Sequence, residues 1–227
     1  MGLSAGASFV ASLVLGGLGV AAIGRGASRE RRMVAAIPLL FAAQHAAEAA
    51  VWSTGGAPLL RCVAVGLFLG IGVVVWPIWL PLSLGLIEES RPRQWALGAT
   101  ARFGAVVATC AAALLLRWHP SAYLAGGGVV YEGLPGQSLA DAVICVLAYL
   151  VVAIVPFFLS TARGARAMGL TLAAALIAAA GVPATARTTV WCLFTLLLSG
   201  QIVRAEWRQR RGANLRPVRT SAIDVTC

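Results

Sequence analysis

Long apolar runs separated by short polar gaps are the feature that most constrains how this chain folds. Seven of them follow one another, at residues 4–23, 33–52, 59–87, 95–116, 138–159, 167–182 and 188–202. A helix needs roughly 20 apolar residues to cross the ~30 Å hydrocarbon core of a bilayer. The chain is 59% hydrophobic and 11% charged, whereas soluble domains are about 45–50% apolar and about 25% charged. We therefore predict an all-α, polytopic membrane helix bundle of seven transmembrane helices, forming one domain over residues 1–203.

The arginines predict how this bundle lies in the membrane. All eighteen basic residues are arginines, and cytoplasmic connections of membrane proteins carry an excess of Lys and Arg. Fifteen of them lie on one side if the runs alternate in direction, and only Arg61, Arg117 and Arg187 lie on the other. This bias predicts that the N-terminus lies outside and the C-terminus in the cytoplasm, and we expect a multi-pass protein of the plasma (inner) membrane.

The net charge of +10 follows from this topology signal, and we expect no nucleic-acid partner. The partner that it indicates is the lipid bilayer. Six of the arginines lie in residues 204–227. This segment is predicted to be a disordered cytoplasmic tail that contacts anionic lipid.

The second run carries a polar trio, Gln44, His45 and Glu48, within an otherwise apolar span. At ~1.5 Å per residue from the start of the run, His45 lies ~18 Å and Glu48 ~22 Å into the ~30 Å core, toward its outer side. His45, Glu48 and Trp52 share one helical face with Phe41. Because lipid rejects such groups, we expect this face to point into the bundle.

A long connection between the fourth and fifth runs lies on the same outer side. It covers residues 117–137 and includes His119, Tyr131 and Glu132. Connections of this length within a compact domain are often functional. We therefore predict an outward-facing polar pocket with this connection as its cover, which binds a small ligand or shuttles protons. Its candidate residues are Gln44, His45, Glu48, Trp52, His119, Tyr131 and Glu132.

Two other interpretations stay open at this point. The polar residues could instead link neighbouring helices in a structural or accessory subunit, with a partner helix packed against Gly66 and Gly70, a Gly-x-x-x-Gly spacing. His45 and Glu48 could also ligate a metal in a membrane enzyme. A metal site needs a third ligand, however, and the chain has only one other histidine. We assign no metal, no cofactor and no catalytic residue.

Some chemistries are excluded or disfavoured by what the sequence lacks. It contains no lysine, so no retinal Schiff base can form. It has no Cys-x-x-Cys pair, no Gly-x-x-x-x-Gly-Lys phosphate loop and no His-Glu-x-x-His helix. These absences leave open whether the chain is an enzyme.

Several short motifs carry a resemblance to a known family. The opening Met-Gly-Leu-Ser-Ala-Gly-Ala-Ser-Phe is similar to Met-Cys-Phe-Ser-x-x-Ala-Ser-Phe, with Gly2 in place of the cysteine. Further similar stretches are residues 37–52, the Trp-Pro-Ile-Trp-Leu-Pro of 76–81 followed by Glu88, and Val130-Tyr131 with Leu134-Pro135. Together they resemble an uncharacterised bacterial family of small multi-spanning membrane proteins. The resemblance implies an architecture and supplies no activity.

Overall fold

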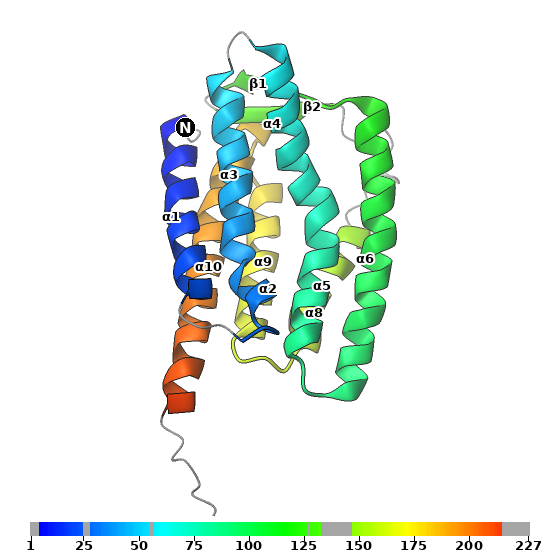
Figure 1. Ribbon diagram of the computed structural model, residues 1–227. Coiled ribbons are helices and arrows are strands. Elements are labelled where there is room, and N and C mark those ends of the chain that lie inside the picture. The colour runs from blue at the N-terminus through cyan, green and yellow to red at the C-terminus, as the bar shows by residue number, and fades with distance from the viewer. Residues whose placement is uncertain (1–4, 25–27, 55–56, 127, 133–146, 215–227) are drawn as a thin grey trace, which may run out of the picture.

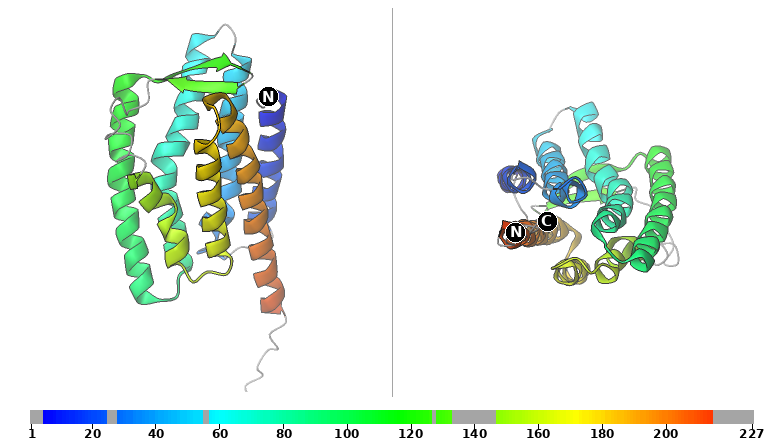
Figure 2. Two further views of the ribbon diagram at one scale, coloured as in Figure 1. Left: turned by 180° about the vertical axis from the view of Figure 1, so that it is seen from behind. Right: turned by 60° about the horizontal axis from the view of Figure 1, so that its bottom comes forward.

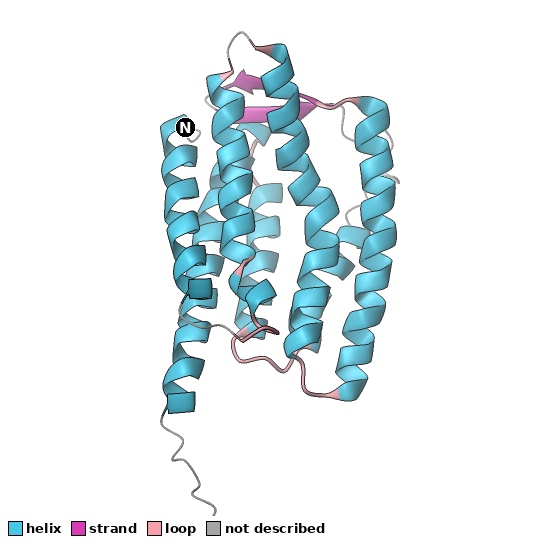
Figure 3. Cartoon of the chain, viewed as in Figure 1, coloured by secondary structure: helices cyan, strands magenta, loops and turns pink. Residues whose placement is uncertain are grey.

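The computed structural model is a bundle of helices with a β-hairpin lying across one end (Figures 1 and 3). It describes the chain except for residues 1–4, 25–27, 55–56, 127, 133–146 and 215–227. The elements are α1 (Ala5–Gly24), α2 (Arg32–Ala35), α3 (Ile37–Ser53), α4 (Pro58–Gly70), the π-helix η1 (Ile71–Val75), α5 (Trp76–Ile87), α6 (Arg91–Trp118), β1 (Ser121–Ala125), β2 (Gly128–Glu132), α8 (Val155–Leu159), α9 (Ala165–Ala180) and α10 (Ala184–Asn214).

Five helical segments of the described chain are long and apolar enough to cross a membrane. They are Ala5–Gly24, Arg32–Ser53, Pro58–Ile87, Arg91–Trp118 and Thr185–Arg211. Two shorter apolar helices, Leu147–Leu159 and Ala165–Ala180, lie at the fifth and sixth predicted runs. A helix of 16 residues is about 24 Å long, which is less than a full hydrocarbon core. The prediction of a helical, membrane-type bundle is confirmed. The first residues of the fifth run, 138–146, lie outside the described chain.

The bundle is built around α3. About two thirds (67%) of the Arg32–Ser53 span is buried, against 11% for the span of α6, so α3 is interior and α6 is peripheral. Phe41 of α3 packs on Trp76 with ring centroids 4.5 Å apart, inside an apolar core cluster. Helix α1 lies close against α3 because Gly19 has no side chain, and a Cβ there would collide with Leu39.

The third run is continuous but contains a π-helical segment. Pro77 has no N–H to donate to the preceding turn, and the wider turn η1 lies just before it. The Tyr149 hydroxyl donates to the Gly72 carbonyl over 3.0 Å, which satisfies an acceptor inside η1. Further along, α5 packs closely on α6, since a Cβ at Gly104 would overlap the Pro77 carbonyl.

The connection after α6 contains a β-hairpin, which the prediction of an all-α bundle did not include. β1 and β2 pair antiparallel, with Ser121 opposite Glu132 and Ala125 opposite Gly128. β-Branched and aromatic residues on either side of a glycine turn explain the pairing. Gly126 has a φ of 53°, and Gly128 lies against the backbone of Thr185 at the start of α10. The hairpin therefore lies across the ends of the helices instead of looping freely (Figure 2).

The prediction that the tail begins at residue 204 also needs correction. Helix α10 continues to Asn214, so residues 204–214 are helical, and residues 215–227 lie outside the described chain. Two contacts hold this extension. Glu206 accepts from Arg31 through both oxygens, the shortest contact being 2.8 Å, and Arg210 donates to the Ala22 carbonyl over 2.6 Å. Partly buried contacts of this kind explain why a charged segment remains helical.

Gly66 and Gly70 have no described atom within 4 Å of the position that a Cβ would take. Among the described residues, no atom therefore contacts the Cβ positions of this Gly-x-x-x-Gly pair. The partner helix expected there stays a prediction.

Candidate functional site

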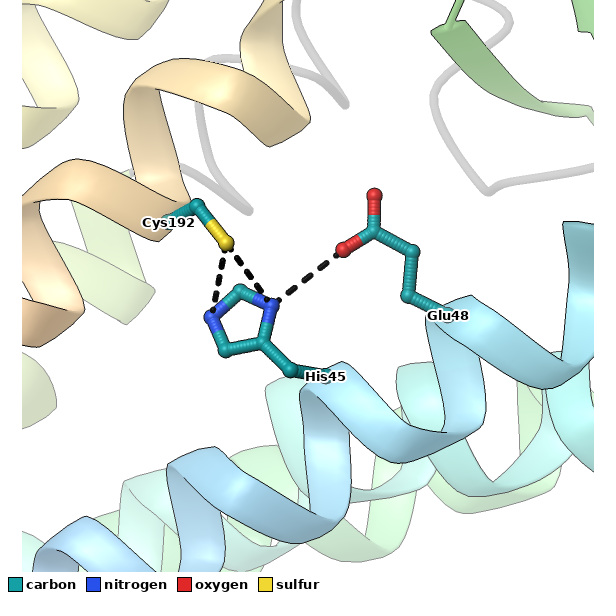
Figure 4. A group of neighbouring side chains, drawn as sticks. All are labelled: His45, Glu48 and Cys192. Atoms are coloured by element: carbon teal, nitrogen blue, oxygen red, sulfur yellow. Dashed lines mark hydrogen bonds and ion pairs between the residues drawn. The ribbon is translucent and has the colours of Figure 1, made fainter. Parts of the chain in front are cut away.

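Two helices far apart in the sequence, α3 and α10, bring a polar cluster into the apolar interior (Figure 4). α3 contributes His45 and Glu48, and α10 contributes Cys192 and Thr195. The members of each pair are three residues apart, so they share one face of their helix. His45 and Glu48 are each 1% exposed, and Cys192 and Thr195 are each 2% exposed. All four side chains are thus removed from solvent.

The His45 ring is the centre of this cluster. Its Nδ1 lies 3.3 Å from Glu48 Oε2 and 3.1 Å from Cys192 Sγ. Its Nε2 lies 3.0 Å from Thr195 Oγ1 and 3.4 Å from the same sulfur. The other carboxylate oxygen, Glu48 Oε1, is buried without a hydrogen-bond partner among the described residues.

The donors and acceptors define which ring nitrogen carries hydrogen. The Thr195 hydroxyl donates its one proton to the Cys192 carbonyl over 2.8 Å. It can therefore only accept from His45, which places a hydrogen on Nε2. In a neutral imidazole, Nδ1 then has a lone pair and lies 3.3 Å from a carboxylate oxygen. A hydrogen on either atom, or a metal ion between them, would make this contact favourable. The Cys192 sulfur is nearly equidistant from both ring nitrogens, so it lies off the lone-pair axis, and as a thiol it carries its own hydrogen.

The spacing of these atoms fits a metal ion. One ligand atom from each of His45, Glu48 and Cys192 lies within 4.8 Å of the other two. In a tetrahedral zinc site with bonds of about 2.0–2.3 Å, neighbouring ligand atoms are about 3.3–3.6 Å apart. The two distances measured from Nδ1, 3.3 and 3.1 Å, are close to this range. Three protein ligands would leave a fourth position for water or substrate.

Gln44 points elsewhere and links helices. Its carbonyl oxygen accepts from Trp76 Nε1 over 3.3 Å, and its amide donates to the Phe68 carbonyl at 3.5 Å. Both partners lie in the Pro58–Ile87 span. For Gln44, the geometry fits the interpretation of a polar link between helices.

Tyr131 and Trp52 lie beside one another in a second apolar cluster at the hairpin end. Tyr131 stacks on Phe68, with centroids 4.7 Å apart and ring planes 6° from parallel. Burial raises the pKa of Tyr131, and the nearby Glu48 carboxylate raises it further. The Tyr131 hydroxyl and Trp52 Nε1 are both buried without hydrogen-bond partners among the described residues. Tyr131 is thus the hairpin residue that reaches toward Glu48.

His119 and Glu132 do not join the cluster. Glu132 is exposed at the end of β2. His119 ends α6 in a left-handed conformation and lines a separate cavity of about 400 Å³ with Arg61. Neither His45 nor Glu48 lines that cavity. The predicted pocket is thus divided into a buried cluster and an outer cavity that do not share these residues.

Sequence reasoning missed Cys192 and Thr195. Both lie in an apolar run, where a cysteine most often serves as a small packing residue. Their three-residue spacing was visible, but only the packing of α10 on α3 selects Cys192 from the other cysteines. Cys62 and Cys110 are exposed on α4 and α6.

A comparison with protein families gives one match. The model of a family of unknown function, DUF6629, matches residues 1–218. No curated protein and no solved structure matches the chain. The uncharacterised family that the short motifs resembled is consistent with this match, which assigns no role to any residue.

Proposed function

The chain belongs to this family of unknown function, and from its geometry we propose a membrane protein with a buried cation-binding centre. The cation is a divalent transition-metal ion, with zinc as the best fit. It is held by His45 Nδ1, a Glu48 oxygen and the Cys192 thiolate. This role replaces the small-ligand pocket as our leading hypothesis, because the buried cluster is compact and lies apart from the outer cavity.

The observation that carries the proposal is the close approach of a carboxylate oxygen and a sulfur to His45 Nδ1, at 3.3 and 3.1 Å. A metal ion between them turns mutual repulsion into attraction. A carboxylate and a thiolate also balance the two charges of the ion, so the loaded centre is neutral. Neutrality matters here because an uncompensated charge is costly to bury.

The neighbouring groups fit the same role. Thr195 would act on the ion through His45, since its hydroxyl fixes the ring tautomer that leaves Nδ1 free. Metal-binding histidines commonly have such an acceptor on their other nitrogen. A mixed set of imidazole, thiolate and carboxylate is typical of zinc ligands. The Tyr131 hydroxyl has no hydrogen-bond partner among the described residues and feels the charge of the Glu48 carboxylate. In this proposal it lies beside the open fourth position.

We further propose the seven-helix topology, with the hairpin end outside a bacterial inner membrane. Support comes from the arginine bias and from two shorter apolar helices that complete the five long ones. Glu48 lies five residues before the end of α3 at Ser53, or about 7 Å along the helix. In this orientation the cation centre lies in the outer leaflet, beneath the hairpin. The arginines of α10 and the chain after it would contact anionic lipid.

Metal analysis of purified protein tests the proposal. The protein is purified in detergent without chelators, on a tag that binds no metal, and dialysed against Zn²⁺. We expect about one zinc per chain in the wild type and in Cys110→Ser, whose cysteine is exposed on α6. Cys192→Ser and Glu48→Gln should retain far less. Co²⁺ loading should give a thiolate-to-cobalt absorption band that Cys192→Ser removes.

Two results would refute the metal proposal: a wild type without stoichiometric metal, or a Cys192→Ser variant that keeps its zinc. A second candidate, proton binding, is favoured by the same Nδ1–Oε2 contact of 3.3 Å. The metal analysis separates the two, because a proton-carrying centre contains no stoichiometric metal. In both functions His45 and Glu48 hold the cation.

A further inference from the structure

A second cavity is lined by residues of the turn from α8 into α9 and by Arg93 near the start of α6. These segments lie at the opposite end of the bundle from the hairpin (Figures 1 and 2). Its volume is about 340 Å³. Three arginines, two hydroxyl side chains and two small residues line it: Arg93, Arg163, Arg166, Ser160, Thr161, Ala162 and Gly164. In the topology proposed above, this cavity opens to the cytoplasm.

The three arginines that line this cavity have N–H groups available to donate to a ligand. Arg93 donates through Nη1 to the Leu159 carbonyl over 3.3 Å, the one side-chain hydrogen bond that it makes to the described residues. Arg163 and Arg166 are exposed. Within the described parts of the chain, none of the three pairs with a carboxylate. Positive charge is therefore gathered around a cavity without being neutralised.

Glu88 is the acidic residue that hydrogen-bonds to Thr161 of the cavity lining, and its carboxylate oxygens already accept hydrogen bonds. Its oxygens accept from the Thr161 N–H and hydroxyl, both over 2.7 Å, and from the Ser90 N–H over 3.2 Å. Glu88 is not among the residues that line the cavity. Its effect is to hold the 160–164 turn in place, which positions Thr161 and the arginines that follow.

The backbone at the start of α9 adds a weaker positive electrostatic potential. Gly164 adopts a left-handed φ of 88° and precedes the first residue of α9. No side chain caps this helix end, so the positive end of its dipole lies at the turn that lines the cavity. The three arginines carry the argument, and the helix end only strengthens it.

From this arrangement we infer that the cavity binds a phosphate group. Guanidinium groups match the oxygens of phosphate in forked pairs, and three of them suit a doubly charged, many-acceptor anion. The Thr161 hydroxyl is not counted among the donors, because it donates to Glu88. The phosphate can belong to a lipid headgroup of the cytoplasmic leaflet or to a soluble compound. This inference stands independently of the cation centre.

The rival explanation is that these arginines serve only as a topology signal. A matched control separates the two, because Arg204 and Arg208 are exposed on α10, on the same side of the bundle, and do not line the cavity. The test compares the double variant Arg163→Gln/Arg166→Gln with Arg204→Gln/Arg208→Gln. A third variant, Arg163→Lys/Arg166→Lys, keeps the charge and loses the forked geometry.

Two probes identify the source of the phosphate. Inorganic phosphate is titrated calorimetrically into purified protein, and phosphatidic acid binding is measured by native mass spectrometry. We expect the glutamine variant to lose tenfold or more affinity, since each hydrogen bond to a charged group is worth roughly a factor of ten or more. The lysine variant should bind more weakly than wild type, and the α10 control should bind as wild type does.

Loss confined to phosphatidic acid identifies a lipid site, and loss confined to inorganic phosphate identifies a soluble ligand. Both results support the cavity. Equal loss in the cavity and α10 variants would show that the effect is general electrostatics, and this would overturn the inference. Absence of binding of both probes to the wild type would overturn it as well. If the glutamine variant fails to fold, the lysine variant still decides.

Discussion

Removing the charge of Glu88 is expected to weaken the contact between the α5–α6 turn and the α8–α9 turn. The residue lies just after α5, outside the membrane-spanning segments, and is 3% exposed. Burial by itself would raise the pKa of Glu88. The hydrogen bonds from Thr161, Ser90 and Ser160 outweigh that effect and hold the pKa below its ordinary value. The folded state thus favours the ionised carboxylate.

The magnitude follows from the three hydrogen bonds that Glu88 accepts. In Glu88→Gln, the amide keeps only one acceptor oxygen. Whichever way it turns, either the Thr161 N–H or the Ser90 N–H loses its acceptor. A buried donor without a partner costs about 1–3 kcal/mol, and the remaining bonds fall from charged to neutral strength, about 1 kcal/mol less. We therefore expect a loss of about 2–4 kcal/mol.

Thermal unfolding in detergent measures this loss. At about 2–4 °C per kcal/mol for a chain of this size, Glu88→Gln should lower Tm by at least about 4 °C. The matched control is Glu89→Gln, because Glu89 is adjacent in sequence and exposed. Its Tm should equal that of the wild type. Equal Tm values for Glu88→Gln and Glu89→Gln would refute the reasoning.

The pH dependence of stability provides a second reading of the same contacts. Because the pKa of Glu88 is lowered in the folded state, its contribution is fully present above the ordinary carboxyl range. It is lost as the pH falls through the lowered value. Between about pH 6 and about pH 3, the wild type should lose more stability than Glu88→Gln. A constant difference in Tm between them over this range would contradict the assigned ionisation.

Two further stability predictions concern helix packing. Gly104→Ala should destabilise the protein by about 1–3 kcal/mol, because the new Cβ overlaps the Pro77 carbonyl, whereas Gly98→Ala on the same helix meets open space and should be neutral or better in the same thermal assay. Glu206→Gln should lower the free energy of unfolding by about 1–3 kcal/mol, because it breaks the two-oxygen contact with Arg31. Arg31→Lys should keep only part of the stability that this contact contributes, because lysine cannot form the fork. A Tm equal to that of the wild type for Gly104→Ala or for Glu206→Gln would contradict the corresponding contact.

The sequence predicted the helices well because their signal is local. Runs of apolar residues define each span, and the described helices coincide with the predicted runs to within a few residues, except at α10 and at the fifth run, whose residues 138–146 lie outside the described chain. Of the face predicted to point inward, Phe41, His45 and Glu48 are buried, and Trp52 is partly buried. A charged or polar group in an apolar span has few alternatives, so its direction can be inferred without a structure.

The errors concern structure that depends on contacts between distant segments. The hairpin had a local signal, since Val129, Val130 and Tyr131 follow a glycine turn, but length alone suggested an irregular cover. Residues 204–214 are charged enough to suggest disorder. They are helical because Arg31 and the Ala22 carbonyl, which lie far away in sequence, provide partners. Neither partner can be identified from composition.

The candidate site shows the same limit in its chemistry. From the sequence, a metal site was improbable because the chain has only two histidines. The second, His119, lies in another cavity. The relevant quantity is the number of donor atoms within reach of His45, and a cysteine counts among them. Cys192 looks like a packing residue in sequence and becomes a candidate ligand only when α10 lies on α3 at the register that also places Thr195 on Nε2. One helix contact therefore provides both the third ligand and the hydrogen bond that frees Nδ1. A shift of α10 by one residue would rotate both away by about 100°. The register of these two helices is thus the structural feature on which the proposed cation centre depends.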